Sequence, residues 1–189
     1  VRVYILRPDS NAGANLESRI SQRFEIFNTP SLDSMPLRGD TSSLVGTLKQ
    51  LEISHIHVHH VGGFRDLPID DLRRLARRLG CLYDVTLHDF APICPRLHLT
   101  DGNGRYCGEP AIDGCERCVS EHGTPFGMVS VRDWREDWRE GLREARRVFC
   151  PTEDTLSRIR RHFPDGNYVI RPHVESLPDP VNRAPRREP

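Results

Sequence analysis

Four of the six cysteines lie between residues 94 and 118, with the spacing C-x12-C-x7-C-x2-C. The stretch "RYCGEPAIDGCERC" contains Cys107, Cys115 and Cys118, and Cys94 lies upstream in "LHDFAPICPR". A C-x2-C pair can chelate one metal ion from a tight turn, and a glycine-containing loop can fold back to supply two more thiolates. Four thiolates favour tetrahedral Zn²⁺. We therefore expect these four cysteines to hold a structural zinc ion.

The spacing alone leaves other states of these cysteines open. Free thiols and an iron–sulfur cluster are both compatible with it. A disulfide is also compatible, although nothing in the sequence indicates export to an oxidising compartment. Cys81 and Cys150 lie beside or inside apolar runs, and we expect them to be core residues.

A histidine and an aspartate, His88 and Asp89, directly follow the apolar run "LYDVTL". A histidine at the end of a strand can donate a hydrogen bond to a ligand or transfer a proton, and the aspartate can orient it. The alternative is a packing role for the histidine and a capping role for the aspartate.

The segment "SHIHVHH" alternates imidazole and apolar side chains. Alternation places His55, His57 and His59 on one face of a strand, where they could bind a metal ion or could be hydrogen-bonded beneath a helix. His60 breaks the alternation and precedes "VGG", so it is the better candidate for a ligand-binding cleft.

The loop "DSNAGAN" contains Asn11 and Gly13 and lacks the G-x-G-x-x-G fingerprint of dinucleotide-binding folds. A pyrophosphate could still approach the Gly13 backbone and the following helix N-terminus. An ordinary turn is the alternative.

The elements that must position these residues alternate along the chain. We predict strands at 1–6, 23–28, 54–60, 82–89, 148–151 and 167–173, and helices at 16–23, 40–51, 69–79, 131–147 and 152–163. Residues 29–39 read as a loop and residues 90–129 as a cysteine-rich insertion. This order predicts an α/β fold with a doubly wound, mostly parallel sheet and helices on both faces.

In such a sheet, ligands bind outside the carboxyl ends of the strands. Polar residues and glycines follow five of the predicted strands: Asn11, Gly13, His59, His60, Gly62, Gly63, His88, Asp89, Thr152 and His173. We therefore expect one cleft along that edge.

The composition narrows the classes of partner. The chain has 189 residues and a formal net charge of zero, so no overall field favours nucleic acid. It contains no apolar run long enough for a transmembrane segment, and no signal peptide is visible. It starts in an apolar strand and ends in the Pro/Arg-rich stretch "PDPVNRAPRREP". We expect one domain (1–175) and a linker or tail (176–189), cut from a longer polypeptide.

Several motifs in order resemble a known family: "NAG", "HIHVHHVGG", "LHDFAPICPR", "DGNGRYCGEP" with "CERC", "VFCPTEDTLSRI" and "YVIRPHVE". Together they resemble the N-terminal, acceptor-side Rossmann-like domain of retaining GT-B glycosyltransferases, in a subset that carries a cysteine-rich insert. These enzymes include bacterial polysaccharide and lipopolysaccharide sugar transferases.

The resemblance implies transfer of a sugar from a nucleotide-sugar donor to a glycan or lipid-linked acceptor, in the cytoplasm or at the inner face of the membrane. It implies a C-terminal nucleotide-sugar-binding domain in the same chain and no catalytic metal. It places His88 beside the donor sugar with Asp89 next to it, and Gly13 near the donor phosphates. The other expected substrate contacts are Asn11, His60, Gly62, Gly63 and Arg96. The fragment alone is expected to fold and bind acceptor weakly without turnover.

Two other readings stay open. The chain could be a zinc-stabilised protein-interaction module on an α/β scaffold. It could also be a metal hydrolase that uses His55, His57 and His59 with the His88–Asp89 pair.

Overall fold

The computed structural model describes residues 4–8, 23–28, 33–38, 41–59 and 69–172, with side chains from Leu44 onward. The strands are β1 (Tyr4–Pro8), β2 (Arg23–Asn28), β3 (Asp33–Arg38), β4 (His55–Val58), β5 (Leu82–Thr86), β6 (Arg147–Cys150) and β7 (Tyr168–Ile170). The helices are α1 (Thr41–Gln50), α2 (Ile69–Leu79), α3 (Ile112–His122), α4 (Val131–Glu144) and α5 (Glu153–His162).

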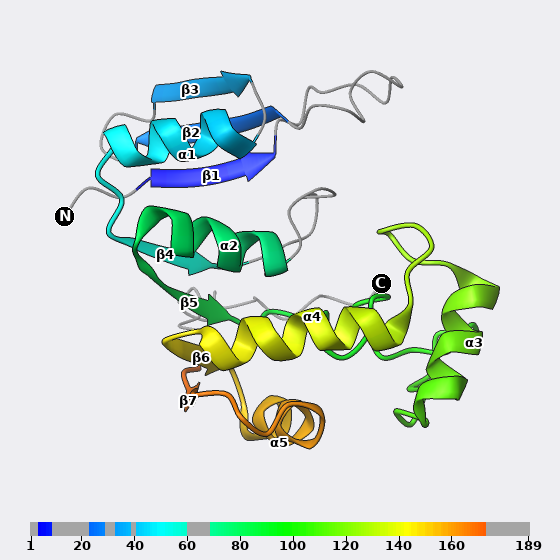
Figure 1. Ribbon diagram of the computed structural model, residues 1–189. Helices are drawn as coiled ribbons and strands as arrows, with labels where there is room; N and C mark the ends of the chain where they lie inside the picture. Colours follow the sequence, from blue (N-terminus) through cyan, green and yellow to red (C-terminus); the bar gives the residue numbers. More distant parts are fainter. Residues whose placement is uncertain (1–3, 9–22, 29–32, 39–40, 60–68, 173–189) are drawn as a thin grey trace, which may run out of the picture.

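The main sheet has four parallel strands in the order β4-β5-β6-β7. Val58 pairs with Val85 and Val85 pairs with Val148, so the carboxyl ends of β4 and β5 lie side by side. Helices α2, α4 and α5 lie in the connections between these strands (Figure 1). The predicted α/β fold with a parallel sheet is therefore confirmed for the second half of the chain.

Helices α2, α4 and α5 all cover the same face of the main sheet. Tyr83 on β5 donates a hydrogen bond from its hydroxyl to the carbonyl of Gly141 on α4 at 2.5 Å. Tyr168 on β7, on the same face as Val148, donates to the carbonyl of Phe163 just after α5 at 2.6 Å. Strands added in one direction through right-handed crossovers keep their helices on one face. A doubly wound sheet needs a reversal of strand order, which the described strands do not show.

The first two predicted strands are strands, but their placement in the parallel sheet was wrong. β1 pairs antiparallel with β2, and β2 pairs antiparallel with β3, in a separate three-stranded sheet. The predicted loop at 29–39 was also wrong, because it contains β3. A proline such as Pro36 favours the prediction of a loop because it lacks an N–H. It is tolerated here because β3 is an edge strand. Most of the helix predicted at 16–23 lies outside the described residues.

From α1 onward the predicted elements are confirmed within a few residues. The apolar face of α2 is buried as its period indicates, and Gly80 ends the helix with a φ of 68°. Thr152 caps α5, since its hydroxyl accepts a hydrogen bond from the N–H of Thr155 at 3.1 Å. Helix α3 lies in the segment predicted only as an insertion, where no apolar period revealed it.

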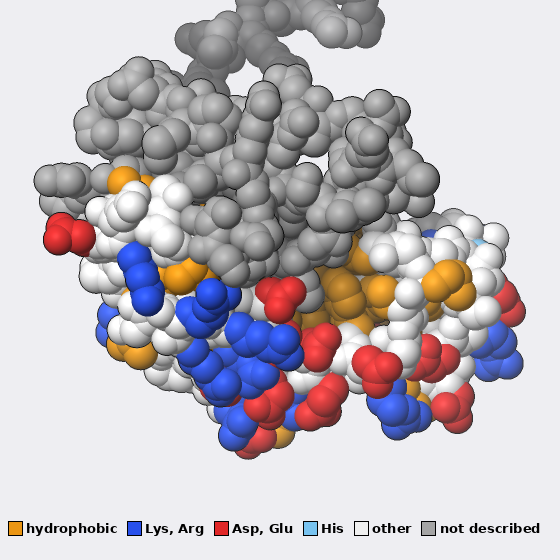
Figure 2. All heavy atoms as spheres, turned by 45° about the horizontal axis from the view of Figure 1, so that its top comes forward, with side chains coloured by type: hydrophobic (Ala, Val, Ile, Leu, Met, Phe, Trp, Pro, Cys, Tyr) orange, Lys and Arg blue, Asp and Glu red, His pale blue; other side chains and the backbone are white. Residues whose placement is uncertain are grey.

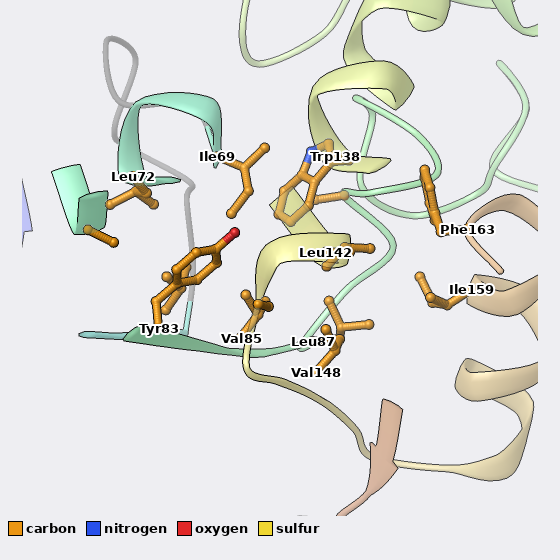
Figure 3. Packing of buried hydrophobic residues seen from close by; sticks show 14 of the residues in the cluster. Ile69, Leu72, Tyr83, Val85, Leu87, Trp138, Leu142, Val148, Ile159 and Phe163 are labelled. Atoms are coloured by element: carbon orange, nitrogen blue, oxygen red, sulfur yellow. The ribbon is translucent and has the colours of Figure 1, made fainter. Parts of the chain in front are cut away.

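The core is one cluster between the sheet and its helices. Figure 3 shows Tyr83, Val85, Leu87 and Val148 rising from the strands toward helix side chains. The figure labels five partners from the helices, and Phe163 just after α5: Ile69, Leu72, Trp138, Leu142, Ile159 and Phe163. Burial of this apolar surface is the main force that holds the helices on the sheet.

Charged side chains on α2 and α4 join the two helices at the surface. Arg73 on α2 donates from Nη1 to Glu144 on α4 at 2.8 Å and also binds Asp70 on its own helix. Arg77 reaches the same Glu144 at 2.5 Å. In the face seen in Figure 2, basic and acidic side chains are interspersed.

The cysteine-rich segment is anchored on the N-terminal half of α4, beside which α3 lies (Figure 1). Trp134 donates from Nε1 to the carbonyl of Ala91 at 2.6 Å, and Arg135 donates from Nε to the carbonyl of Ile93 at 2.8 Å. Glu116 on α3 accepts the backbone N–H of Arg132 at 3.0 Å. These bonds fix the turn after β5 and helix α3 to one rigid element.

Candidate functional site

Two histidines meet at the carboxyl edge of the main sheet. His59 follows β4, His88 follows β5, and Nδ1 of His59 lies 3.0 Å from Nε2 of His88. Their ring centroids are 5.3 Å apart. One nitrogen must donate and the other accept, so the tautomers of the two rings are coupled. The sequence predicted His88 at this edge, and the structure adds His59 as its partner.

A small cavity opens beside the pair, with a volume of about 20 Å³. That volume is enough for about one water molecule or one ligand hydroxyl. Its lining comes from the two strand ends, the turn that follows β5 and one residue of α4: Val58, His59, Val85, Thr86, Leu87, His88, Asp89, Ala91, Pro92, Leu97 and Trp138. The lining therefore combines polar side chains, those of His59, Thr86, His88 and Asp89, with apolar ones.

Asp89 lines the same cavity and holds the turn that follows it. Its Oδ1 accepts a hydrogen bond from the backbone N–H of Ala91 at 2.8 Å. This is the capping contact considered as an alternative in the sequence. It fixes the direction in which the chain leaves β5, and so the position of His88.

The strand histidines share one face, as predicted, and each contacts a different side chain on β5. Nε2 of His55 lies 3.0 Å from Asp84, and Nε2 of His57 lies 2.8 Å from Oγ1 of Thr86. The His57 and His59 rings stack with centroids 4.3 Å apart. This face is opposite to the one covered by α2, α4 and α5, so the expected helix over the histidines is not among these three.

Burial and hydrogen bonds shift the pKa values of two titratable residues on this face, His57 and Asp84. Burial lowers the pKa of His57, against an opposing effect of Asp84. Hydrogen bonds from Arg146, at 2.6 and 3.0 Å, hold the pKa of Asp84 below its usual value despite burial. The neutral imidazole of His57 and the ionised carboxylate of Asp84 are therefore favoured.

The other predicted substrate contacts are placed as follows. Asn11, Gly13, His60, Gly62 and Gly63 lie outside the described residues. Arg96 contacts the cysteines instead of the cavity at the strand ends: its Nη1 donates to the sulfur of Cys118 at 3.2 Å.

The four predicted cysteines line one cavity of about 30 Å³. Arg135 on α4 donates from Nη2 to the sulfur of Cys115 at 3.3 Å, and this thiol also lies 3.5 Å from the carbonyl of Pro110. Burial raises the pKa of Cys94 and Cys115, and Arg135 opposes the rise at Cys115. As the side chains stand, no three or more His, Cys, Asp or Glu residues in the described ranges form a group that could hold a metal ion.

The remaining two cysteines lie away from this cavity. Cys150 at the end of β6 is fully buried in the main core, and burial raises its thiol pKa to about 11. Cys81 follows α2 and packs against the core in part. The prediction of a core residue is therefore confirmed for Cys150, whereas Cys81 lies only partly buried at the edge of the core.

A buried carboxylate that the sequence analysis missed links the insertion to α5. Glu109 is 4% exposed at its side chain and binds Arg158, Arg161 and His162, all on one face of α5. Burial alone would raise the pKa of Glu109, but hydrogen bonds from Tyr106, His162 and Arg158 hold it below its usual value. The basic face of α5 was visible in the sequence, but its acidic partner some fifty residues upstream was not.

Comparisons with protein-family models, with curated proteins and with solved structures found no match to this chain. The assignment of a function therefore rests on the geometry of the site and on the motifs of the sequence.

Proposed function

We propose that this chain is the acceptor-side domain of a nucleotide-sugar glycosyltransferase of the retaining GT-B class. The observation that carries the proposal is the His59–His88 pair, which lines a cavity at the carboxyl edge of a parallel sheet. Ligands of open α/β sheets bind at this edge. An imidazole can donate a hydrogen bond to a sugar hydroxyl or accept one from it.

The chemistry of sugar transfer agrees with such a site. Breaking a sugar–phosphate bond builds positive charge on the sugar ring and negative charge on the leaving diphosphate. A histidine that orients a hydroxyl without attacking the sugar contributes by positioning. In this role His88 holds the donor sugar, and Asp89 fixes the backbone from which His88 projects.

The described residues supply only one wall of the proposed site, since a cavity of about 20 Å³ holds one group and not a whole sugar. In this proposal the rest of the site comes from the C-terminal nucleotide-sugar-binding domain that the family resemblance implies, while the expected contacts Gly13 and Gly62 lie outside the described residues. The acceptor is a glycan or a lipid-linked glycan.

The proposed setting is the cytoplasm or the inner face of the membrane, and no nucleic acid is involved. Separately, none of the described helices is both long enough and apolar enough to cross a membrane.

The geometry favours sugar transfer over the two other readings. His55 and His57 occupy alternate positions on β4, and His59 occupies the next alternate position just after the strand. His55 contacts Asp84 and His57 contacts Thr86, both on β5, whereas His59 contacts His88 beyond the strand. Among the described residues these imidazoles form no group of three that could hold a metal ion. For an interaction module, nothing would require a histidine pair at the ligand-binding edge of the sheet.

The test is release of nucleoside diphosphate by the full-length protein from a panel of nucleotide sugars, with glycans and lipid-linked glycans as acceptors. We expect turnover with at least one donor, and a loss of at least about 100-fold for His88→Ala, the size of effect that a group acting in the transition state has. The matched control is His98→Ala, an exposed histidine in the cysteine-rich insertion. Absence of donor consumption by the folded protein, or equal losses in both variants, would overturn the proposal.

A further inference from the structure

The four clustered cysteines come from three separate parts of the insertion. Cys94 lies in the turn after β5, where its N–H donates to the carbonyl of Phe90 at 2.9 Å. Cys107 follows a short hairpin and is held by its N–H to the carbonyl of Leu99 at 2.9 Å. Cys115 and Cys118 lie one turn apart on α3 and so share a face of the helix. Three backbone segments, each held by its own hydrogen bonds, thus place four thiols at one cavity.

The cavity between these thiols suits a soft cation. Its volume of about 30 Å³ exceeds the roughly 10–15 Å³ that a water-sized occupant needs. Apart from the sulfur atoms, the side chains that line it are apolar except for Thr100 and Arg135. No carboxylate or imidazole lines it, so its possible ligands are almost all sulfur.

Two arginines donate hydrogen bonds to sulfur atoms of the cluster. Arg96 donates to Cys118 at 3.2 Å and Arg135 donates to Cys115 at 3.3 Å. A guanidinium is always charged and binds a thiolate much better than a thiol. Four thiolates around one divalent cation carry a net charge of −2, which these two arginines balance.

The backbone of the insertion also indicates an additional constraint. Leu97, Leu99 and Glu109 have positive φ angles of 75°, 51° and 51°. A residue other than glycine in this region costs on the order of 1–3 kcal/mol and persists only where its surroundings hold it there. Leu97 lies three residues after Cys94 and Glu109 two residues after Cys107, so two of these conformations lie beside cysteines of the cluster.

We infer that Cys94, Cys107, Cys115 and Cys118 bind one Zn²⁺, with Arg96 and Arg135 as its outer-shell partners. The ion replaces the thiol protons: one Zn²⁺ and four thiols give one tetrathiolate complex and four released protons. Because no such ligand group exists among the described side chains as they stand, binding requires the sulfur atoms to turn toward the cavity that all four cysteines line. Zinc fits better than calcium or magnesium because those ions prefer oxygen ligands.

The inference goes beyond the proposed function, because a structural ion in the insertion is independent of the reaction at the strand ends. The ion orders the segment between β5 and α4 and holds it against the N-terminal half of α4. Arg135 on α4 links the two, since it donates hydrogen bonds both to the sulfur of Cys115 and to the carbonyl of Ile93.

The first experiment measures metal content in the full chain purified without chelators. We expect one zinc per chain by elemental analysis, and loss of that zinc in Cys115→Ser and Cys94→Ser. The matched control is Cys81→Ser, which removes a partly buried cysteine outside the cluster and keeps one zinc per chain.

A second measurement does not depend on the stability of cysteine variants. The wild-type chain is stripped of metal and loaded with Co²⁺, whose absorption reports its ligands. We expect thiolate-to-cobalt charge-transfer bands and the intense visible bands of tetrahedral coordination, both removed by one equivalent of Zn²⁺.

The arginines are tested by competition against a chromophoric chelator. We expect Arg135→Gln to weaken zinc binding by about 10-fold to 100-fold, the usual effect of losing an outer-shell partner. Arg139→Gln, one turn along α4 and paired with Glu136 instead, leaves the affinity unchanged. A folded wild-type chain without stoichiometric metal, iron in place of zinc, or disulfides among these four cysteines would each overturn the inference.

Discussion

The side chains of Glu109 and His162 are 53 residues apart in the sequence and meet at 3.1 Å between Oε2 and Nε2. The contact joins the cysteine-rich insertion to α5, and Arg158 binds the same carboxylate. Because the carboxylate is buried, its partners lose charge-assisted hydrogen bonds if it is neutralised.

We therefore predict that Glu109→Gln lowers the free energy of unfolding by about 2 kcal/mol. Chemical denaturation at neutral pH measures the change. Glu136→Gln is the control, since it removes an exposed carboxylate that pairs with Arg139 on the surface of α4, and its effect should stay within about 0.5 kcal/mol. Equal effects of the two variants would contradict a specific link between the insertion and α5.

Asp84 gives a second prediction, which includes a dependence on pH. Its buried carboxylate accepts two hydrogen bonds from Arg146 and a third contact from His55. We expect Asp84→Asn to lower the free energy of unfolding at pH 7 by about 1–3 kcal/mol, because the amide cannot replace the charged acceptor.

The sign of the pH effect follows from the lowered pKa of Asp84. The unfolded state takes up a proton near pH 4, whereas the folded state does so only at lower pH. The stabilisation is therefore complete above about pH 4 and is lost as the pH falls through the folded-state pKa. The difference between Asp84→Asn and wild type should shrink on acidification, and a constant difference from pH 7 to pH 3 would contradict this account.

The most accurate predictions from the sequence concerned elements that are defined by a regular spacing of apolar residues within one short segment. Helix α2 was predicted at its observed bounds because its apolar residues recur at helical spacing and Gly80 ends it. Strand β1 was predicted as a strand but in the wrong sheet. A β-branched, apolar run predicts an extended conformation, whereas its partner and direction depend on contacts distant in the sequence. The same reason explains why Asp33–Arg38 was read as a loop around Pro36.

In the candidate site, too, the sequence predicted some features and not others. The spacing of the cysteines predicted that they would gather, and they line one cavity. The contact of His59 with His88 could not be read from either segment, because it depends on the register between β4 and β5. Arg96 was expected near substrate from its motif, yet it binds Cys118. A motif places residues in order along the chain but does not give the direction of each side chain.

A third prediction concerns His57, whose pKa burial lowers. Asp84 opposes this effect, while His55, His88 and Arg146 add to it. Because the unfolded state binds the proton near pH 6.5 and the folded state only below that, stability falls as the pH drops through this range.

We expect the melting temperature of the wild type to fall between pH 7.5 and pH 5.5, and the fall to be smaller in His57→Gln. His162 has a lowered pKa too and contributes a fall of the same sign to both proteins. His98→Gln, at an exposed site, serves as the control and should keep the full wild-type slope. An unchanged slope in His57→Gln would mean that His57 is not the group that titrates.

The last prediction concerns two helical glycines with opposite surroundings. A Cβ at Gly141 on α4 would lie 2.4 Å from Cγ1 of Ile69, which is 2% exposed, whereas a Cβ at Gly46 on α1 would meet nothing within 4 Å. Alanine is better than glycine inside a helix by about 0.5–1 kcal/mol. We therefore expect Gly46→Ala to raise the free energy of unfolding by about that amount.

At Gly141 the steric conflict outweighs helix propensity, because forcing a methyl group into a packed core costs about 1–3 kcal/mol. Gly141→Ala should therefore destabilise the protein, with both variants measured by chemical denaturation. In an Ile69→Ala background the conflicting Cγ1 is gone, so adding Gly141→Ala should cost nothing or become stabilising. If Gly141→Ala were destabilising to the same extent in both backgrounds, the close approach of α4 to Ile69 could not be its cause.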